Sequence, residues 1–338
     1  MTSLVESVND RRSGVEAIIK AAKNLPSIET QVAYPKKLRS LRKFIKKTNS
    51  KLNYVSSGTG GHTFRGKMKV DDNIHYYALK IVPYRVNKQY GDETNHERPE
   101  NAEVHTLCLL SQFIADRDTP HLVWPITTFN TKLSSIKKLR LHKRIPRKGV
   151  EKKFNKFTEY IENGDNRSKF HDVVSILISE WANAGDLLTF LRNNFRDLND
   201  VQWRVIFFQV LHPLAVIHKE LPGFRHNDLK ANNILIHKPS EKSSLRRDHI
   251  TYRIDNIKFK LPNLGYVLRM WDYDFSSTPK YVTNAKVNTD WCKSINVLSE
   301  QNQYYDMHYF FYTLFYHAFI KDFFTCKTVP LKVKEFVE

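Results

Sequence analysis

Short apolar runs fill the first half of the chain. Four of them are rich in β-branched and aromatic residues and are separated by polar segments, as is typical of short strands. These runs are residues 54–68, 74–82, 121–129 and 173–181. Between the second and third runs, residues 101–114 instead carry apolar side chains at helical spacing. The pattern predicts a β-rich unit that contains one main helix.

The second half of the chain has a different pattern. Apolar residues recur every three or four positions through residues 187–214, which predicts amphipathic helices. Residues 1–49 alternate apolar and charged stretches, which favours a basic helical extension outside the main domain. We therefore expect an α+β protein with a strand-rich lobe at residues 50–182 and a mostly helical lobe at residues 183–338.

Composition allows a large buried core, since 41% of the 338 residues are apolar and 12% are aromatic. Three scattered cysteines lack the spacing of a disulfide framework or a zinc site and fit a reducing compartment. The N-terminus does not resemble a signal peptide, and no uncharged stretch approaches the ~18 residues of a membrane span. We expect a soluble protein of the cytoplasm, the nucleus or a viral particle.

The net charge of +19 is concentrated in two segments. Residues 36–51 hold eight Lys/Arg and no acid, and the insertion at residues 132–156 holds eleven Lys/Arg and one Glu. Such clusters attract nucleic acid, anionic lipid or acidic proteins through Coulomb forces that weaken with salt. A solvated basic helix and loop is the alternative interpretation.

The strongest chemical motif is His-Asn-Asp-Leu-Lys-Ala-Asn-Asn-Ile-Leu at residues 226–235. Phosphoryl transfer needs a carboxylate near the attacking hydroxyl, a cation near the moving phosphate and an oxygen ligand for Mg²⁺. Asp228, Lys230 and Asn233 match these three roles. The segment resembles the H-R-D-L-K-x-x-N catalytic loop of protein kinases, with Asn227 in place of Arg.

A second acidic segment, Leu-Arg-Met-Trp-Asp-Tyr-Asp-Phe-Ser at residues 268–276, resembles the kinase D-F-G motif. The resemblance implies that Asp272 is a magnesium ligand and that Tyr273 takes the Phe position. Asp274 stands where Gly is expected, so Asp274 as the metal ligand stays open. We prefer Asp272 because it directly follows the apolar run.

A glycine-rich segment lies at residues 56–64, where three of the eleven glycines fall within four positions between two predicted strands. Glycines there let backbone amides approach phosphates closely. The segment resembles a degenerate G-x-G-x-x-G loop of kinases, which implies nucleotide contacts. These contacts are expected at Ser56, Gly58, Thr59, Gly60 and Gly61. A simple hairpin turn is the alternative.

Lys80, within Tyr-Ala-Leu-Lys-Ile, resembles the lysine of the kinase V-A-I-K strand. That lysine contacts the α- and β-phosphates and pairs with a Glu on the following helix. Glu103 is the preferred partner because Glu100 lies next to Pro99, where a helix should only begin. Glu100 is the fallback.

Two further segments resemble kinase parts. Residues 180–187 resemble the hinge, whose backbone groups bind adenine, which implies contacts at Glu180 and Ala182; an ordinary strand-to-helix loop is the alternative. Asp306 resembles the aspartate that braces the catalytic loop from behind, although a helix N-cap would explain it too.

The resemblance runs in order from residue 56 to about residue 315 and implies a bilobal protein kinase-like fold with a reduced C-lobe. It implies transfer of the γ-phosphoryl group of ATP, with Mg²⁺, to serine or threonine hydroxyls of proteins. A polar insertion at residues 238–262 is expected to be a surface excursion, and no Ala-Pro-Glu follows Asp272. These departures resemble the divergent protein kinases of large DNA viruses, including poxvirus virion kinases, and the shortening resembles haspin-like kinases.

Two other functions are consistent with parts of the sequence. Choline and aminoglycoside kinases share an H-x-D loop, but Lys230 and the hinge segment favour a protein kinase. A pseudokinase or nucleic-acid-binding scaffold would explain the basic segments and the imperfect glycine loop. The expected partners are protein substrates, with acidic proteins and proteins associated with nucleic acid as the candidates. Direct contact of the basic segments with nucleic acid is open.

Overall fold

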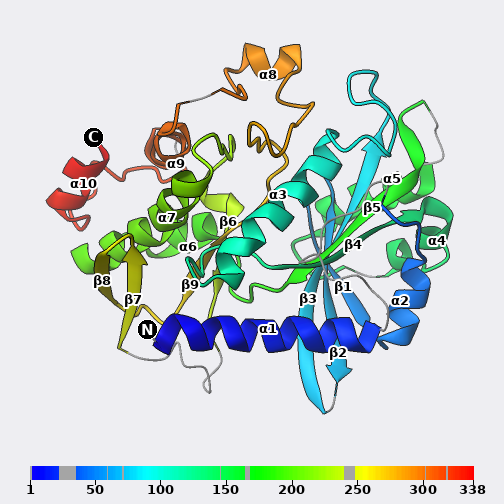
Figure 1. The fold of residues 1–338 in the computed structure, drawn as a ribbon, viewed down its shortest axis with the longest axis horizontal. Coiled ribbons are helices and arrows are strands. Elements are labelled where there is room, and N and C mark those ends of the chain that lie inside the picture. Colours follow the sequence, from blue (N-terminus) through cyan, green and yellow to red (C-terminus); the bar gives the residue numbers. More distant parts are fainter. Residues whose placement is uncertain are drawn as a thin grey trace.

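The chain folds into a strand-rich lobe and a helical lobe in the computed structural model (Figure 1). The structure describes residues 2–22, 36–58, 60–70, 72–144, 146–163, 168–239, 248–300, 302–316 and 319–338. The prediction of an α+β, bilobal kinase-like fold is confirmed.

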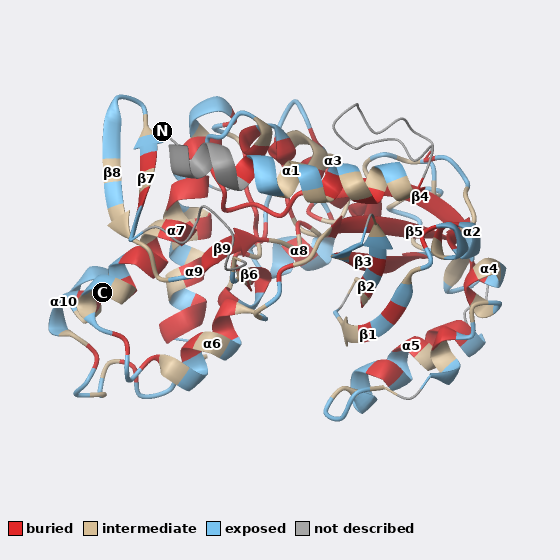
Figure 2. Cartoon of the chain, turned by 90° about the horizontal axis from the view of Figure 1, so that it is seen from below, coloured by how far each residue is buried: buried red, intermediate tan, exposed pale blue. Residues whose placement is uncertain are grey.

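The strand-rich lobe, or N-lobe, is built on a five-stranded antiparallel sheet in the order β1-β2-β3-β5-β4. Its strands are β1 (Lys51–Ser57), β2 (His62–Val70), β3 (Asn73–Arg85), β4 (Pro125–Lys132) and β5 (Phe170–Glu180). All four predicted runs form strands, and the predicted helix is α3 (Pro99–Ala115). Strand β4 is buried up to Lys132, and β5 is buried at residues 174–179 (Figure 2), because helices and β3 cover them.

The helical lobe, or C-lobe, is organised around α7 (Asp200–Glu220). This helix begins with a capping box in which Asn199 and Gln202 satisfy each other's backbone amides, and it buries Trp203 and Ile206. The other elements of this lobe are α6 (Leu187–Asn194), η2 (Ala231–Asn233), β6 (Ile234–His237), β7 (His249–Ile254), β8 (Ile257–Pro262), β9 (Val267–Met270), α8 (Asp290–Ser294), α9 (Tyr305–Phe315) and α10 (Leu331–Val337).

The N-terminal segment is not an extension outside the main domain, so that prediction is wrong. Helix α1 (Thr2–Ala22) runs along both lobes and contacts β2 and β4 of one and β7 of the other (Figure 1). Its apolar face, including Val15 and Ile18, joins the same hydrophobic core as Phe44 of α2 (Leu41–Lys47). An amphipathic helix is stabilised when its apolar face packs on the body.

The basic insertion at residues 132–156 forms α4 (Leu133–Lys137), η1 (Leu141–Lys143) and the first part of α5 (Glu151–Asn163). Helix α5 lies beside β1, with Phe154 5.1 Å from Tyr54 and Phe157 5.1 Å from Phe64 between ring centroids. The basic segment therefore has an aromatic face that anchors it over the first two strands.

The polar insertion at residues 238–262 is more than a surface excursion in its described part. Strands β7 and β8 pair as a hairpin, and Ile250 and Tyr252 are buried. The Tyr252 ring lies 4.9 Å from that of Phe208 on α7. The expectation of a surface excursion was wrong because the hairpin carries its own apolar face onto the C-lobe.

Candidate active site

An ion-pair network centred on Lys80 lies between the lobes. The Lys80 Nζ atom on β3 lies 2.6 Å from Glu103 Oε1 on α3 and 2.9 Å from Asp272 Oδ1 just after β9. Lys80 and Glu103 are buried, whereas the Asp272 side chain is 36% exposed. The fallback partner, Glu100, instead pairs with Arg98 at 3.2 Å. Three elements distant in the sequence thus converge on one lysine.

Mutual attraction decides the charge states in this network. Burial alone would lower the pKa of Lys80, but Asp272 and Glu103 outweigh it, so the pKa lies above its ordinary value. Burial would raise the pKa of Asp272, yet Lys80 holds it below its ordinary value. For Glu103 burial is the larger effect and raises the pKa, against the attraction of Lys80. Lys80 is therefore a fixed cation beside an ionised Asp272.

The catalytic-loop residues form a second network. The Lys230 Nζ atom lies 2.8 Å from Asp228 Oδ1. From the turn η2, Asn233 donates its side-chain amide to Asp228 Oδ2 and to the Asp228 carbonyl, both at 2.9 Å. The Asp228 carboxylate is thereby held from two sides with a defined orientation.

Asp306 supports the backbone of this loop. Its buried carboxylate accepts hydrogen bonds from the backbone amides of His226, at 2.7 Å, and Asn227, at 2.8 Å. The predicted bracing role is confirmed. Asn227 adopts a φ of 62°, a left-handed conformation that Asn tolerates better than most residues, and donates its side-chain amide to the Phe275 carbonyl at 3.0 Å.

Backbone contacts place Asp272 beside the catalytic loop. The Trp271 amide donates to the Asn233 carbonyl at 3.0 Å, and His226 Nε2 lies 3.1 Å from the Trp271 carbonyl. Tyr273, the next residue after Asp272, is fully buried, with its ring 5.0 Å from that of His226. The chain turns sharply here, since Asp272 has a φ of 68°.

Asp274 lies in a different environment from Asp272. Its carboxylate forms an ion pair with Lys286, whose Nζ lies 3.5 Å from the centroid of the Phe275 ring. It also faces the glycine loop, since a Cβ added at Gly60 would lie 3.6 Å from Asp274 Oδ2. A cavity of about 460 Å³ is lined by Asp274 together with Asp228, Lys230, Glu103 and Gly60.

The glycine loop is a tight turn between β1 and β2. The Gly58 amide donates to the Gly61 carbonyl at 2.9 Å, and a Cβ at Gly61 would lie only 2.8 Å from the Ile81 carbonyl oxygen. Ser56 accepts a hydrogen bond from Lys153 of α5 at 3.1 Å. Thr59, another expected nucleotide contact, lies outside the described residues. Phosphate binding by this loop stays a prediction.

The side chain of Glu180, in the expected hinge, is committed to the protein itself. Arg11 of α1 and Arg269 of β9 both pair with its buried carboxylate, which also accepts from the Trp124 amide at 2.7 Å. Burial would raise the pKa of Glu180, but the two guanidinium groups lower it to about 2. Its own amide donates to the Trp124 carbonyl at 3.0 Å. If Glu180 contacts adenine, its backbone carbonyl would make the contact, and the backbone of Ala182 would make the second expected contact.

Several residues of the site were missed in the sequence. Arg269 offered a signal, because a charged residue inside a short apolar strand is rarely buried without a partner. Tyr309, whose hydroxyl donates to Asp228 Oδ1 at 3.5 Å, lies one helical turn after Asp306 and could have been sought there. Arg11 carried no signal, since nothing in its own segment points to Glu180.

No cluster of three or more His, Cys, Asp or Glu side chains suited to holding a metal is found among the described residues. Mg²⁺ typically takes only one or two protein carboxylates and fills its other positions with phosphate oxygens and water. Within the same described ranges, no helix is long and apolar enough to cross a bilayer.

Comparison with known proteins identifies the family. Residues 95–325 match the family model described as "Poxvirus serine/threonine protein kinase". The chain is 40% identical over 308 residues to "Putative serine/threonine-protein kinase R400" of Acanthamoeba polyphaga mimivirus, covering 89% of this chain and 63% of that protein. It is 25% identical over 245 residues to "Putative serine/threonine-protein kinase R301" of the same virus, covering 66% and 59%. It thus spans about three fifths of the length of these relatives. The chain belongs to the poxvirus serine/threonine protein kinase family.

Proposed function

We propose that this protein transfers the γ-phosphoryl group of ATP, with Mg²⁺, to serine and threonine side chains of other proteins. The observation that carries the proposal is the meeting of two networks between the lobes, Lys80–Glu103–Asp272 and Asp228–Lys230–Asn233. Phosphoryl transfer depends mainly on positioning and charge neutralisation, which this arrangement of fixed charges can supply.

Nucleotide binding in this proposal uses both lobes. Lys80 and the amides of Gly60 and Gly61 hold the phosphates, and the hinge backbone at residues 180–182 receives the adenine. The Asp272 carboxylate and the Asn233 amide oxygen are hard oxygen donors of the kind that Mg²⁺ prefers, so the residues fit the ion. When bound, Mg²⁺ would offset phosphate charge.

Acceptor chemistry falls to the catalytic loop. Asp228 accepts the proton of the attacking hydroxyl and orients it, while Lys230 offsets charge on the transferred group. Because Lys230 and Asn233 already hold the Asp228 carboxylate, little reorganisation is required when the acceptor binds. We place the activity in the host cytoplasm or the virion, in keeping with the viral relatives.

The test is radiolabelled ATP incubated with the purified protein and either a protein mixture or choline and aminoglycosides. Asp228→Asn should lower kcat by roughly three orders of magnitude or more with little change in ATP affinity. Asp290→Asn, at a side chain that is 91% exposed, is the matched control and should leave kcat unchanged. Label confined to the small molecules, or near-normal turnover by Asp228→Asn, would refute the proposal.

A further inference from the structure

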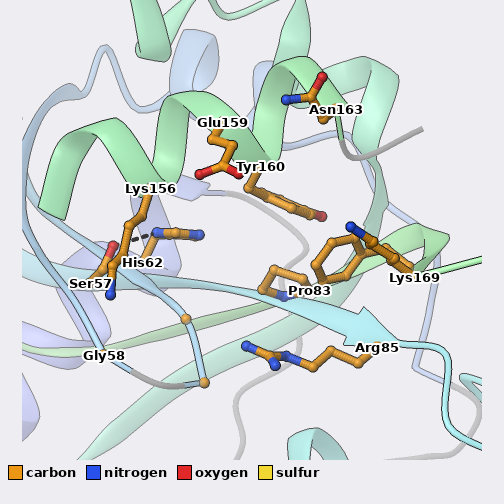
Figure 3. A pocket seen from close by; sticks show the side chains of 13 residues that line it. Ser57, Gly58, His62, Pro83, Arg85, Lys156, Glu159, Tyr160, Asn163 and Lys169 are labelled. Carbon is orange, nitrogen blue, oxygen red and sulfur yellow. Dashed lines mark hydrogen bonds between the residues drawn. The ribbon is translucent and has the colours of Figure 1, made fainter. Parts of the chain in front are cut away.

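A second cavity lies on the outer side of the glycine loop. It has a volume of about 590 Å³ and is enclosed by α5, by the turn between β1 and β2, by the end of β3 and by the start of β5 (Figure 3). Pro83, Tyr160 and Phe170 supply apolar walls. Its size is that of a site for a small ligand or a few residues of a peptide.

Basic side chains dominate the polar lining of this cavity. Arg85, Lys156 and Lys169 line it from three different elements, whereas Glu159 is the one carboxylate among the described lining residues. Figure 3 shows Lys156 reaching from α5 toward His62 at the edge of the glycine loop.

His62 lies beside these basic side chains at the edge of the cavity. Burial, with smaller contributions from Arg85 and Lys156, lowers the pKa of His62 to about 4. The histidine is therefore neutral near pH 7 and shares a hydrogen bond with Ser57, with Nδ1 2.7 Å from Oγ. Because Arg85, Lys156 and Lys169 outnumber the one carboxylate, Glu159, among the described lining residues, the cavity favours an anion.

The second cavity adjoins the catalytic one. Gly60, Pro83 and Arg85 line both, so the glycine loop and the end of β3 form their common wall. Lys230 and Lys286 line the catalytic side. A polypeptide whose hydroxyl lies at Asp228 could thus extend past Arg85 toward Lys156 and Lys169.

We infer that this cavity is an acceptor subsite that binds a phosphorylated or acidic side chain near the target serine or threonine of a protein substrate. The inference deepens the proposed kinase function and rests on it. A protein segment is favoured over nucleic acid because the cavity is small, has apolar walls and adjoins the cavity where the hydroxyl is bound. Phosphate or carboxylate would accept charge-assisted hydrogen bonds from the three basic side chains.

The test compares two peptides that share one acceptor serine. One carries phosphoserine or aspartate, placed in turn at successive positions on either side of the acceptor. The other carries alanine at those positions. The wild type should show a higher kcat/KM for the acidic peptide. Lys156→Ala/Lys169→Ala should lower that preference roughly three- to tenfold and leave the alanine peptide unchanged, since exposed charges contribute modestly.

The control is Lys148→Ala/Lys152→Ala, which removes the same amount of charge at residues of the basic insertion that do not line the cavity. It should keep the preference. If Lys148→Ala/Lys152→Ala lost the preference for the acidic peptide to the same extent, the preference would arise from net charge and the subsite would be overturned. A wild type with equal kcat/KM for both peptides would overturn it too.

A binding measurement separates this inference from the proposed function. Fluorescence anisotropy of the labelled phosphopeptide with Asp228→Asn protein should show binding that weakens when Lys156 and Lys169 are also replaced. If no peptide is phosphorylated but this binding persists, the kinase proposal fails and the anion site stands. If a single-stranded oligonucleotide binds more tightly with the same dependence on both lysines, the peptide assignment is overturned.

Discussion

Replacement of Arg11 by methionine tests how the N-terminal helix holds the two lobes together. The Arg11 guanidinium donates to Glu180 and to the carbonyls of Pro120, at 3.0 Å, and Leu122, at 2.6 Å. Glu180 ends the N-lobe sheet and also pairs with Arg269 of the C-lobe. The side chains of Arg11 and Glu180 are 6% and 11% exposed, so solvent screens their pairing little.

The size of the effect follows from the pKa of Glu180. A fall from 4.5 to about 2 corresponds to roughly 3 kcal/mol of stability from the charged carboxylate. Arg11 lowers the pKa of Glu180 more than Arg269 does, so the loss of its charge should cost about 2 kcal/mol. The lost hydrogen bonds to the Pro120 and Leu122 carbonyls should cost about 1 kcal/mol more. We expect Arg11→Met to lower the free energy of unfolding by about 2–3 kcal/mol near pH 7.

Urea unfolding followed across pH supplies the measurement. Because the folded pKa of Glu180 is depressed, its stabilisation is complete above about pH 5 and is lost as the pH falls toward about 2. Arg11→Met should remove about half of this acid-dependent loss. Lys20→Met, an exposed change on the same helix, should stay within about 0.5 kcal/mol of the wild type. An Arg11→Met protein with wild-type stability and a wild-type acid response would refute the reasoning.

Two further substitutions test the nucleotide site. Gly61→Ala should raise the KM for ATP roughly tenfold, because its Cβ would lie 2.8 Å from the Ile81 carbonyl oxygen and displace the loop. The control is Gly58→Ala, which should change this KM little because no atom lies within 4 Å of the added Cβ. Asp272→Asn should lower Mg²⁺-dependent turnover at least ~10-fold more than Asp274→Asn. The reason is that Asp272 lies beside Asn233 and Lys80, whereas Lys286 neutralises Asp274. The reverse ranking in steady-state kinetics would move the metal ligand to Asp274.

Local pattern was sufficient to predict the sheet and the main helix. Strands β1 to β5 and helix α3 all carry their signal within a few adjacent residues, in the spacing of apolar side chains. The bracing by Asp306 was also predictable, because it follows from a motif with a fixed order relative to residues 226–235. These features depend little on what packs against them.

The role of the appended segments was not predictable in the same way. Amphipathicity predicts that α1 buries a face but not which surface receives it, and the partner of Arg11 is 169 positions away in the chain. The hairpin at β7 and β8 shows the same limit, since its polar composition hid the buried Ile250 and Tyr252. Long-range packing decided both cases, and no single segment contains that information.

Helix α9 holds the catalytic loop in place with one of its faces. Asp306 and Tyr309 are three residues apart, which puts them on one face of the helix, directed at the loop. Asp306 fixes the backbone at His226 and Asn227, and Tyr309 reaches Asp228 itself. Burial and, to a smaller extent, Asp228 together raise the pKa of the Tyr309 hydroxyl to about 12, so Tyr309 stays a hydrogen-bond donor to that carboxylate. One helix face thus supplies both the backbone support and a side-chain contact to the catalytic loop.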